Sequence, residues 1–192
     1  MKRIAFLVSG SGTNMENLIT RIHSGEVPAV PVLVISNKPG VKALDRAKEL
    51  GVPSKVISHK DYATRELFDE SLAQCIDSHK IDIIVLAGFM RVLTERFVKK
   101  YHGRLINIHP ALLPAFPGAH AIKDAWDAKV KETGVTVHFV DSGVDTGPII
   151  LQEKVSVLPN DTLETLELRI HSLEYELYPQ ALNLVLSGKG MT

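Results

Sequence analysis

The segment IAFLVSGSGTNMENLITRI, residues 4–22, decides the fold class of this chain. It begins with the apolar run Ile4–Val8, continues through the glycine-rich turn Ser9–Asn14, and then places apolar residues at helical spacing. The residues of that helical stripe are Met15, Leu18, Ile19 and Ile22. A strand, a tight turn and a crossover helix in this order predict the first half of a βαβ unit.

The same alternation of apolar runs and helical segments continues along the chain. Further runs lie at Val30–Ile35, Val56–Ile57, Ile81–Leu86, Leu105–Ile108, Val135–Val140 and Ile149–Val157. The first four runs of the chain are nearly continuous in apolar residues, which is typical of parallel strands covered by helices on both faces. We therefore expect an α/β fold with a doubly wound, mostly parallel sheet, whose ligands bind beyond the carboxyl ends of the strands.

Two of the expected helices have distinct signals. The segment Tyr62–Ile76 repeats the helical spacing, and its residues expected to face inward are Leu67, Phe68, Leu72 and Ile76. The sequence Asp161-Thr-Leu-Glu164 has an acid at the cap position and a glutamate three residues later, as in a capping box. A late helix is therefore expected to start near Thr162 and to end before Pro179.

The composition sets limits on the class of protein. The 192 residues form one expected domain, 1–192, because no linker-like stretch or internal repeat interrupts them. Lysine plus arginine equals aspartate plus glutamate at 22 each, so no overall charge favours a nucleic acid or an anionic membrane. No apolar run approaches the roughly 20 residues of a membrane span. The single cysteine, Cys75, excludes an internal disulfide and fits a reducing compartment, by default the cytoplasm.

The turn Ser9–Asn14 carries the first sign of a binding site. Glycines between a strand and a helix allow main-chain N–H groups to point at an anion. A Walker A loop is disfavoured because the Gly-Lys-Ser/Thr ending is absent, and a dinucleotide loop because Met15 replaces the third glycine. The run ending at Ile35 is followed by no acid that would hold a cofactor ribose. A single phosphate is the better interpretation, and a tight turn without a ligand is the alternative.

The second sign is a cluster of polar residues late in the chain. Asn107 and His109 alternate along one expected strand, so their side chains share a face. An amide donor beside an imidazole can stabilise an oxyanion and transfer protons, although a core histidine with an asparagine partner is the alternative. Asp145 lies in a glycine-rich bend and could raise the pKa of His109 if it lies nearby, the alternative being a turn aspartate. No sequence motif with metal-ligand spacing is present, so we expect no metal.

Four motifs in order resemble phosphoribosylglycinamide formyltransferases. They are Ser9-Gly-Ser-Gly-Thr-Asn14, Val85-Leu-Ala-Gly-Phe-Met-Arg-Val-Leu93, Asn107-Ile-His-Pro-Ala-Leu-Leu-Pro114, and Gly134-Val-Thr-Val-His-Phe-Val140 followed by Asp145-Thr-Gly-Pro148. The resemblance covers essentially the whole chain. It implies a Rossmann-like fold and transfer of a formyl group from 10-formyltetrahydrofolate to the amine of glycinamide ribonucleotide, in purine biosynthesis, by a monomer or a homodimer.

The resemblance also implies roles for individual residues. Asn107 would stabilise the tetrahedral intermediate, His109 would transfer the proton, and Asp145 would raise the pKa of His109. The residues implied to bind the acceptor are Gly12, Thr13, Asn14, His171, Ser172, Leu173 and Glu174. Those implied to bind the folate are Arg65, Met90, Arg91, Val92, Leu93, Asn107, Asp141, Ser142, Gly143, Val144 and Asp145. The other histidines are expected to be structural, with His120 and His138 the two that lie near the expected site.

Three other functions stay open at this point. Two are enzymes that use the same donor, a formyl-folate hydrolase and a methionyl-tRNA formyltransferase. The family resemblance leads us to expect an additional domain in each of them, which the length of this chain disfavours. The third is a nucleotide-binding module without catalysis, which the combination of Asn107, His109 and Asp145 disfavours.

Overall fold

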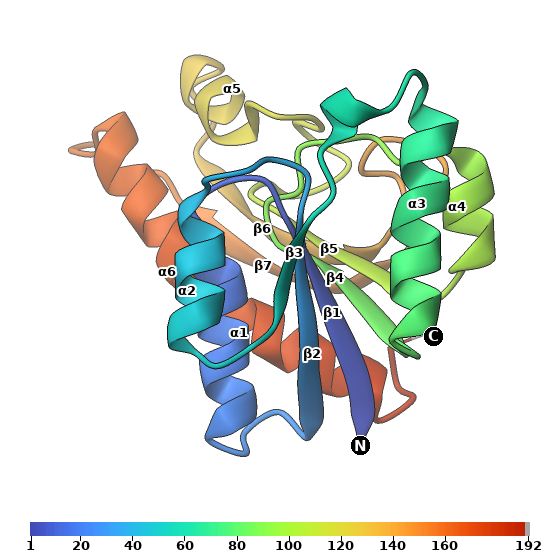
Figure 1. The fold of residues 1–192 in the computed structure, drawn as a ribbon. Coiled ribbons are helices and arrows are strands. Elements are labelled where there is room, and N and C mark those ends of the chain that lie inside the picture. Colours follow the sequence, from blue (N-terminus) through green and yellow to red (C-terminus); the bar gives the residue numbers. More distant parts are fainter. Residues whose placement is uncertain (191–192) are drawn as a thin grey trace. The chain divides into compact units, whose positions relative to one another are not determined.

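The computed structural model describes residues 1–190 and contains one mostly parallel sheet flanked by helices (Figure 1). Its strands are β1 (Lys2–Val8), β2 (Ala29–Ser36), β3 (Ser54–Val56), β4 (Ile83–Leu86), β5 (Leu105–His109), β6 (Glu132–Phe139) and β7 (Ile149–Ser156). The strand order is β3-β2-β1-β4-β5-β6-β7. The expected α/β class and the expected strands are thus confirmed. The chain packs into two compact units, residues 1–106 and the segment from residue 107 onward.

The first unit is a parallel sheet with helices on two sides. Its helices are α1 (Thr13–His23), α2 (Lys42–Glu49), the short 3₁₀ helix η1 (His59–Asp61), α3 (Arg65–Ser78) and α4 (Glu95–Lys100). β1 pairs in parallel with β2 and β4, and β2 pairs in parallel with β3. Helix α1 contacts α2, helix α3 contacts α4, and Figure 1 shows the two pairs on opposite sides of the strands. This double cover explains why Ile4–Val8 is fully buried.

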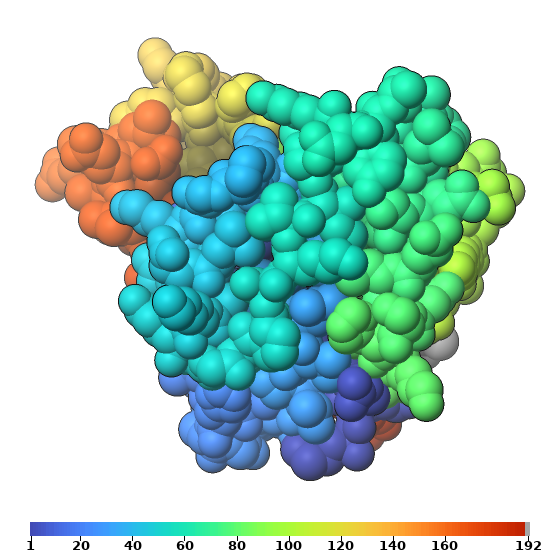
Figure 2. All heavy atoms as spheres, viewed as in Figure 1, coloured from blue at the N-terminus to red at the C-terminus, as the bar shows by residue number. Residues whose placement is uncertain are grey.

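One of the four runs expected to be covered on both faces, Val56–Ile57, is only half covered, because Ile57 is buried but Val56 is exposed. All three residues of β3 are exposed, including Val56. The strand pairs only with β2 because it forms the edge of the sheet. Figure 2 shows the corresponding segment, coloured teal near residue 55, at the surface of the first unit. The apolar content of a run therefore does not establish burial when the strand lies at an edge.

The expectations for α3 were partly wrong. The helix begins after Thr64, whose hydroxyl accepts a hydrogen bond from the N–H of Leu67 at 3.3 Å. Phe68, Leu72 and Ile76 are buried as expected, but Leu67 is 49% exposed. Leu67 lies one residue before Phe68, about 100° around the helix, and this places it off the buried stripe. The short helices α2 and α4 were not expected, because so few apolar residues define their inner faces.

The second unit is built on an antiparallel hairpin. β6 pairs with β7, and both strands pack against the long helix α6 (Leu163–Leu186), which also contacts α5 (Ala121–Asp127). Although apolar and polar residues alternate along β6, seven of its eight residues are buried. The polar face of β6 therefore has to be satisfied by hydrogen bonds inside the protein.

Helix α6 starts near Thr162 as expected, but its capping pair and its end differ from the expectation. Its cap is Thr162 paired with Thr165, not Asp161 paired with Glu164, and Asp161 instead accepts hydrogen bonds from Thr165 and Arg169. The helix also continues through Pro179. Leu177, Tyr178, Ala181 and Leu182 are all buried on either side of this proline. The burial of that face outweighs the helix-breaking tendency of a single proline.

None of the helices within residues 1–190 is long and apolar enough to cross a membrane.

Candidate functional site

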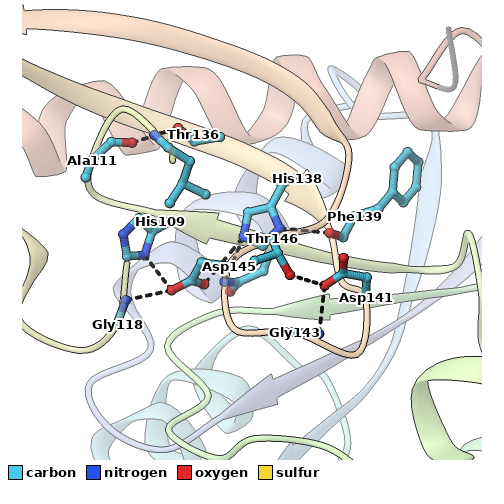
Figure 3. A network of polar contacts seen from close by, with 12 residues as sticks. His109, Ala111, Gly118, Thr136, His138, Phe139, Asp141, Gly143, Asp145 and Thr146 are labelled. Atoms are coloured by element: carbon cyan, nitrogen blue, oxygen red, sulfur yellow. Dashed lines mark hydrogen bonds and ion pairs between the residues drawn. The ribbon is translucent and has the colours of Figure 1, made fainter. Parts of the chain in front are cut away.

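The carboxylate of Asp145 lies between two buried histidines of the second unit (Figure 3). Its Oδ2 is 3.4 Å from Nδ1 of His109 and accepts a hydrogen bond of 2.8 Å from the N–H of Gly118. Its Oδ1 is 3.7 Å from Nε2 of His138. Asp145 itself has a backbone φ of 55°, a left-handed conformation uncommon for a residue with a side chain. The bend between β6 and β7 thus holds the carboxylate against both rings.

The surroundings of Asp145 stabilise its charged form. The pKa of the carboxyl is lowered from 3.8 to about 2, chiefly by His138, and burial acts in the opposite direction. The Gly118 N–H and the charge of His109 lower the pKa further. Because the His138 contact is 3.7 Å, we regard it as electrostatic rather than as a full hydrogen bond. Asp145 is therefore a carboxylate at any pH near neutrality.

The ring of His109 is held in one orientation. Its Nε2 lies 2.7 Å from the carbonyl oxygen of Phe116, and since a carbonyl only accepts, this nitrogen carries the proton. Its Nδ1 faces Asp145. The ring is 4% exposed, so its position is set by the protein and not by solvent. A proton added to this ring is placed at Nδ1, beside the carboxylate.

His138 connects Asn107 to the same carboxylate. Its Nδ1 donates to the carbonyl of Phe139 at 2.8 Å, which leaves Nε2 directed at the cluster. Nδ2 of Asn107 lies 3.4 Å from that Nε2. The three residues expected to act together, Asn107, His109 and Asp145, thus lie in one cluster, with His138 among them. Of the two histidines expected near the site, His138 thus lies in the cluster.

The remaining residues of the bend mainly shape it. Oδ1 of Asp141 accepts from the N–H of Gly143 at 3.0 Å and from the hydroxyl of Thr146 at 2.7 Å. A side chain on Gly147 would collide with the carbonyl of Phe139, so only glycine fits there. Asp141 is therefore a turn aspartate in this structure, and Ser142, Gly143 and Val144 are exposed along the bend. His120 is exposed at the start of α5.

Residues of α2 donate hydrogen bonds to two carbonyls of the glycine loop in the first unit. The N–H of Ala43 donates to the carbonyl of Gly10 at 3.1 Å, and Nε of Arg46 donates to the carbonyl of Ser11 at 3.0 Å. Gly12 caps α1 with a φ of 74°, and a Cβ there would lie 2.5 Å from that of Ala43. The loop carbonyls are thus turned into the unit, while the N–H groups of the first turn of α1, which includes Thr13 and Asn14, have no acceptor within the helix. This arrangement suits an anion.

A buried serine joins the glycine loop to the segment after β4. The hydroxyl of Ser9 donates to Oδ1 of Asn37 at 2.6 Å and accepts from the N–H of Met90 at 2.8 Å. Ser9 and Asn37 are both almost fully buried, and Asn37 also contacts Nδ1 of His59 at 3.2 Å. The strand ends of β1, β2 and β4 are therefore connected by one network of mostly neutral groups. Sequence patterns did not identify Ser9 as part of it.

Of the residues that the resemblance assigned to the folate, five belong to the first unit, and most of these lie on its surface. Met90 and Val92 are exposed between β4 and α4, whereas Leu93 is buried. The guanidinium of Arg91 lies 5.2 Å from the centre of the Phe68 ring, within cation–π distance. Arg65 is the first residue of α3 and is exposed.

The residues assigned to the acceptor's amine lie on α6. Glu174 is buried, not solvated as an isolated helix residue would be, and its Oε2 is 2.8 Å from Nδ1 of His171. This contact raises the pKa of His171 above its usual value. Ser172 bonds back to the carbonyl of Leu168, and Leu173 is half-buried. Among residues 1–190 no group of histidine, cysteine, aspartate or glutamate side chains is arranged to hold a metal ion.

Comparisons with known proteins show the family to which the chain belongs. Residues 2–182 match the formyl transferase family model. The phosphoribosylglycinamide formyltransferase of Bacillus subtilis is 41% identical over 186 residues, which cover 97% of this chain and 95% of the relative. The trifunctional purine biosynthetic protein adenosine-3 of Drosophila melanogaster is 51% identical over 192 residues, but this chain covers only 14% of its length.

Solved structures of the same family are also similar to this chain. The structure of phosphoribosylglycinamide formyltransferase from Bacillus halodurans superposes with a TM-score of 0.94 at 47% identity, covering 97% of this chain and 96% of that one. Glycinamide ribonucleotide transformylase 1 from Symbiobacterium toebii gives a TM-score of 0.95 at 41% identity, with 98% and 89% covered. The chain therefore belongs to the formyl transferase family.

Proposed function

We propose that this chain transfers the formyl group of 10-formyltetrahydrofolate to the primary amine of glycinamide ribonucleotide, a step of purine biosynthesis, and acts as one formyltransferase domain. The observation that carries the proposal is the cluster in which Asn107, His109 and Asp145 meet. Family membership and the names of the nearly full-length relatives support it. A hydrolase or a tRNA formyltransferase would use the same donor, and the assay below separates them.

The cluster supplies the groups that acyl transfer to an amine requires. The amine nitrogen attacks the formyl carbon, and the carbonyl oxygen becomes an oxyanion that an N–H of Asn107 stabilises. The amine then loses a proton, the bond between the formyl carbon and N10 breaks, and N10 takes up a proton. His109 is the group that transfers this proton, and the carboxylate of Asp145 stabilises its imidazolium form, 3.4 Å away.

Two sets of residues would bind the acceptor, one at its phosphate and the other at its ammonium group. The glycine loop, with Gly12, Thr13 and Asn14, binds the phosphate through main-chain N–H groups. Glu174 and His171 lie on α6 as a pair 2.8 Å apart, and the carboxylate of Glu174 is a suitable partner for the glycinamide ammonium. Ser172 and Leu173 lie between these two residues in the same helix.

The donor is held by main chain and apolar surface. The segment Met90–Leu93 offers exposed apolar side chains and a main chain fixed by Ser9, which suits a flat pterin ring. Arg65, an exposed cation at the start of α3, is the proposed partner of the acidic end of the folate. The bend from Asp141 to Val144 contributes main-chain contacts.

The proposal is tested by incubating the purified protein with 10-formyltetrahydrofolate and glycinamide ribonucleotide, and by following both products in chelator-treated buffer. We expect N-formylglycinamide ribonucleotide and tetrahydrofolate in equal amounts. Release of formate without acceptor would indicate a hydrolase, and formylation of methionyl-tRNA in a parallel reaction would indicate the tRNA enzyme. No turnover above background with any acceptor would reject the proposal.

A further inference from the structure

One face of β6 contacts the segment Pro110–Gly118, here called the proline segment. Alternate residues of a strand share a face, so Gly134, Thr136 and His138 form a row. A side chain on Gly134 would collide with Leu112 and with the carbonyl of Glu153. Leu112 therefore lies directly on the backbone of β6, and the row begins with a close packing contact.

The hydroxyl of Thr136, the next residue of the row, has three hydrogen bonds (Figure 3 draws the one to Ala111). It donates to the carbonyl of Ala111 at 2.7 Å and accepts from the N–H of Leu113 at 3.2 Å. Nε2 of Gln152, directly opposite Thr136 in the β6–β7 pairing, donates to the same hydroxyl at 2.8 Å and to the carbonyl of Leu113 at 3.0 Å. Thr136 is fully buried, so these bonds are its only means of satisfying the hydroxyl.

The far end of the proline segment holds the catalytic cluster. The carbonyl of Phe116 accepts from Nε2 of His109, and the N–H of Gly118 donates to Asp145. These two contacts are only two residues apart in the chain. A displacement of the proline segment would therefore move the imidazole and the carboxylate together.

We propose that Thr136 and Gln152 are positioning residues, which attach the proline segment to the hairpin and thereby fix the orientation of His109 and Asp145. The inference rests on the proposed formyl transfer. The hydrogen bonds of both side chains go to Ala111, to Leu113 and to each other, so both act through the proline segment. Misplacement of a catalytic group by about 1 Å can lower a rate by about 100-fold.

The test is the pair Thr136→Val and Thr133→Val. Both threonines are buried in β6, but the hydroxyl of Thr133 has no hydrogen-bond partner within residues 1–190. We expect Thr136→Val to lower kcat by about 10- to 100-fold, with the KM of both substrates within about threefold. Thr133→Val should keep kcat within about twofold, because it removes no hydrogen bond. Thr136→Ser, which retains the hydroxyl, should restore most of the activity.

A second readout does not depend on activity. In protein labelled with ¹⁵N-histidine, the ring N–H of His109 that donates to Phe116 should exchange slowly with solvent. Thr136→Val should accelerate that exchange at least about tenfold, since the acceptor moves, while Thr133→Val should leave it unchanged. If the unaltered chain transfers no formyl group, the proposed function fails but this comparison still tests the positioning.

Two results would overturn the inference. One is a kcat for Thr136→Val within threefold of the unaltered protein, and the other is an unchanged exchange rate at His109. If Thr136→Val does not fold, Gln152→Met replaces it, because Gln152 is exposed and only its two bonds are lost. That variant should lower kcat by about three- to tenfold, in keeping with the loss of one or two hydrogen bonds, and an unchanged kcat would count against the proposal equally.

Discussion

The glycine loop of the first unit and the Asp145 cluster of the second use buried polar groups differently. Around the loop, Ser9, Asn37 and main-chain groups form a network whose innermost members are neutral. In the cluster, a carboxylate with a pKa of about 2 lies between two imidazoles. Neutral dipoles hold a ligand in the same way at any pH near neutrality, whereas titratable groups transfer protons. In the proposed function, the phosphate is therefore held by neutral main-chain groups, whereas the formyl transfer relies on ionisable side chains.

The largest effect should come from removing the imidazole of the cluster. We expect His109→Ala to lower kcat by about 10³-fold, because general acid–base groups contribute about 10²–10⁴. The KM values should change little, since the ring acts on the transition state rather than on bound substrate. Steady-state kinetics with both substrates checks this. A loss of donor affinity with unchanged kcat would instead make His109 a binding residue.

The charge of Asp145 should appear in the pH dependence of stability. Its pKa is lowered from 3.8 to about 2 by folding, so the ionised group stabilises the folded protein above about pH 4. That contribution, about 2 kcal/mol, should be lost as the pH falls from about 4 to about 2. The measurement is the free energy of unfolding in urea for the unaltered protein and for Asp145→Asn. The difference between the two should shrink as the pH falls from about 4 to about 2, and a difference that stays the same over this range would contradict the assignment.

The neutral network should affect binding more than chemistry. Ser9→Ala leaves the N–H of Met90 and the amide of Asn37 without their shared partner, so the Met90 segment should lose its fixed position. We expect the KM for the folate to rise about tenfold and kcat to stay within about threefold, consistent with about 1.4 kcal/mol. Ser24→Ala, at an exposed serine after α1, is the control and should change neither. A fall in kcat without a change in KM would contradict this prediction, because it would mean that Ser9 affects the reaction rather than folate binding.

The smallest effects should come from the helix caps, which lie outside both regions. Thr64→Ala removes the cap of α3 in the first unit, and Thr162→Ala removes that of α6 in the second. Each should lower the free energy of unfolding by about 1 kcal/mol and leave kcat unchanged. Thermal unfolding and the standard assay measure both. A change in kcat for either variant would contradict the prediction, because it would mean that the end of that helix affects the catalytic groups.

Much of the site was accessible from the sequence because its signals are local. The glycine loop follows a strand directly, and Asn107 and His109 alternate along one strand, so their approximate places follow from the backbone alone. Asp145 was identified by its glycine-rich bend, but its distance to His109 was not. That distance depends on the left-handed backbone at Asp145 and on the N–H of Gly118, which lies 27 residues away.

The sequence by itself determined the fold class, the succession of strands, the helices α1, α3 and α6, and the resemblance to the formyl transferase family, because apolar spacing and short motifs act over a few residues. Only the tertiary structure decided that β3 is exposed, that Leu67 faces outward and that α6 continues through Pro179. It also decided that the hydroxyl of Thr136 is hydrogen-bonded whereas that of Thr133 has no partner in the described part of the chain, although both are threonines of the same strand. The physical reason is that burial and hydrogen-bond partners depend on which distant segments pack together, and no local pattern encodes that choice.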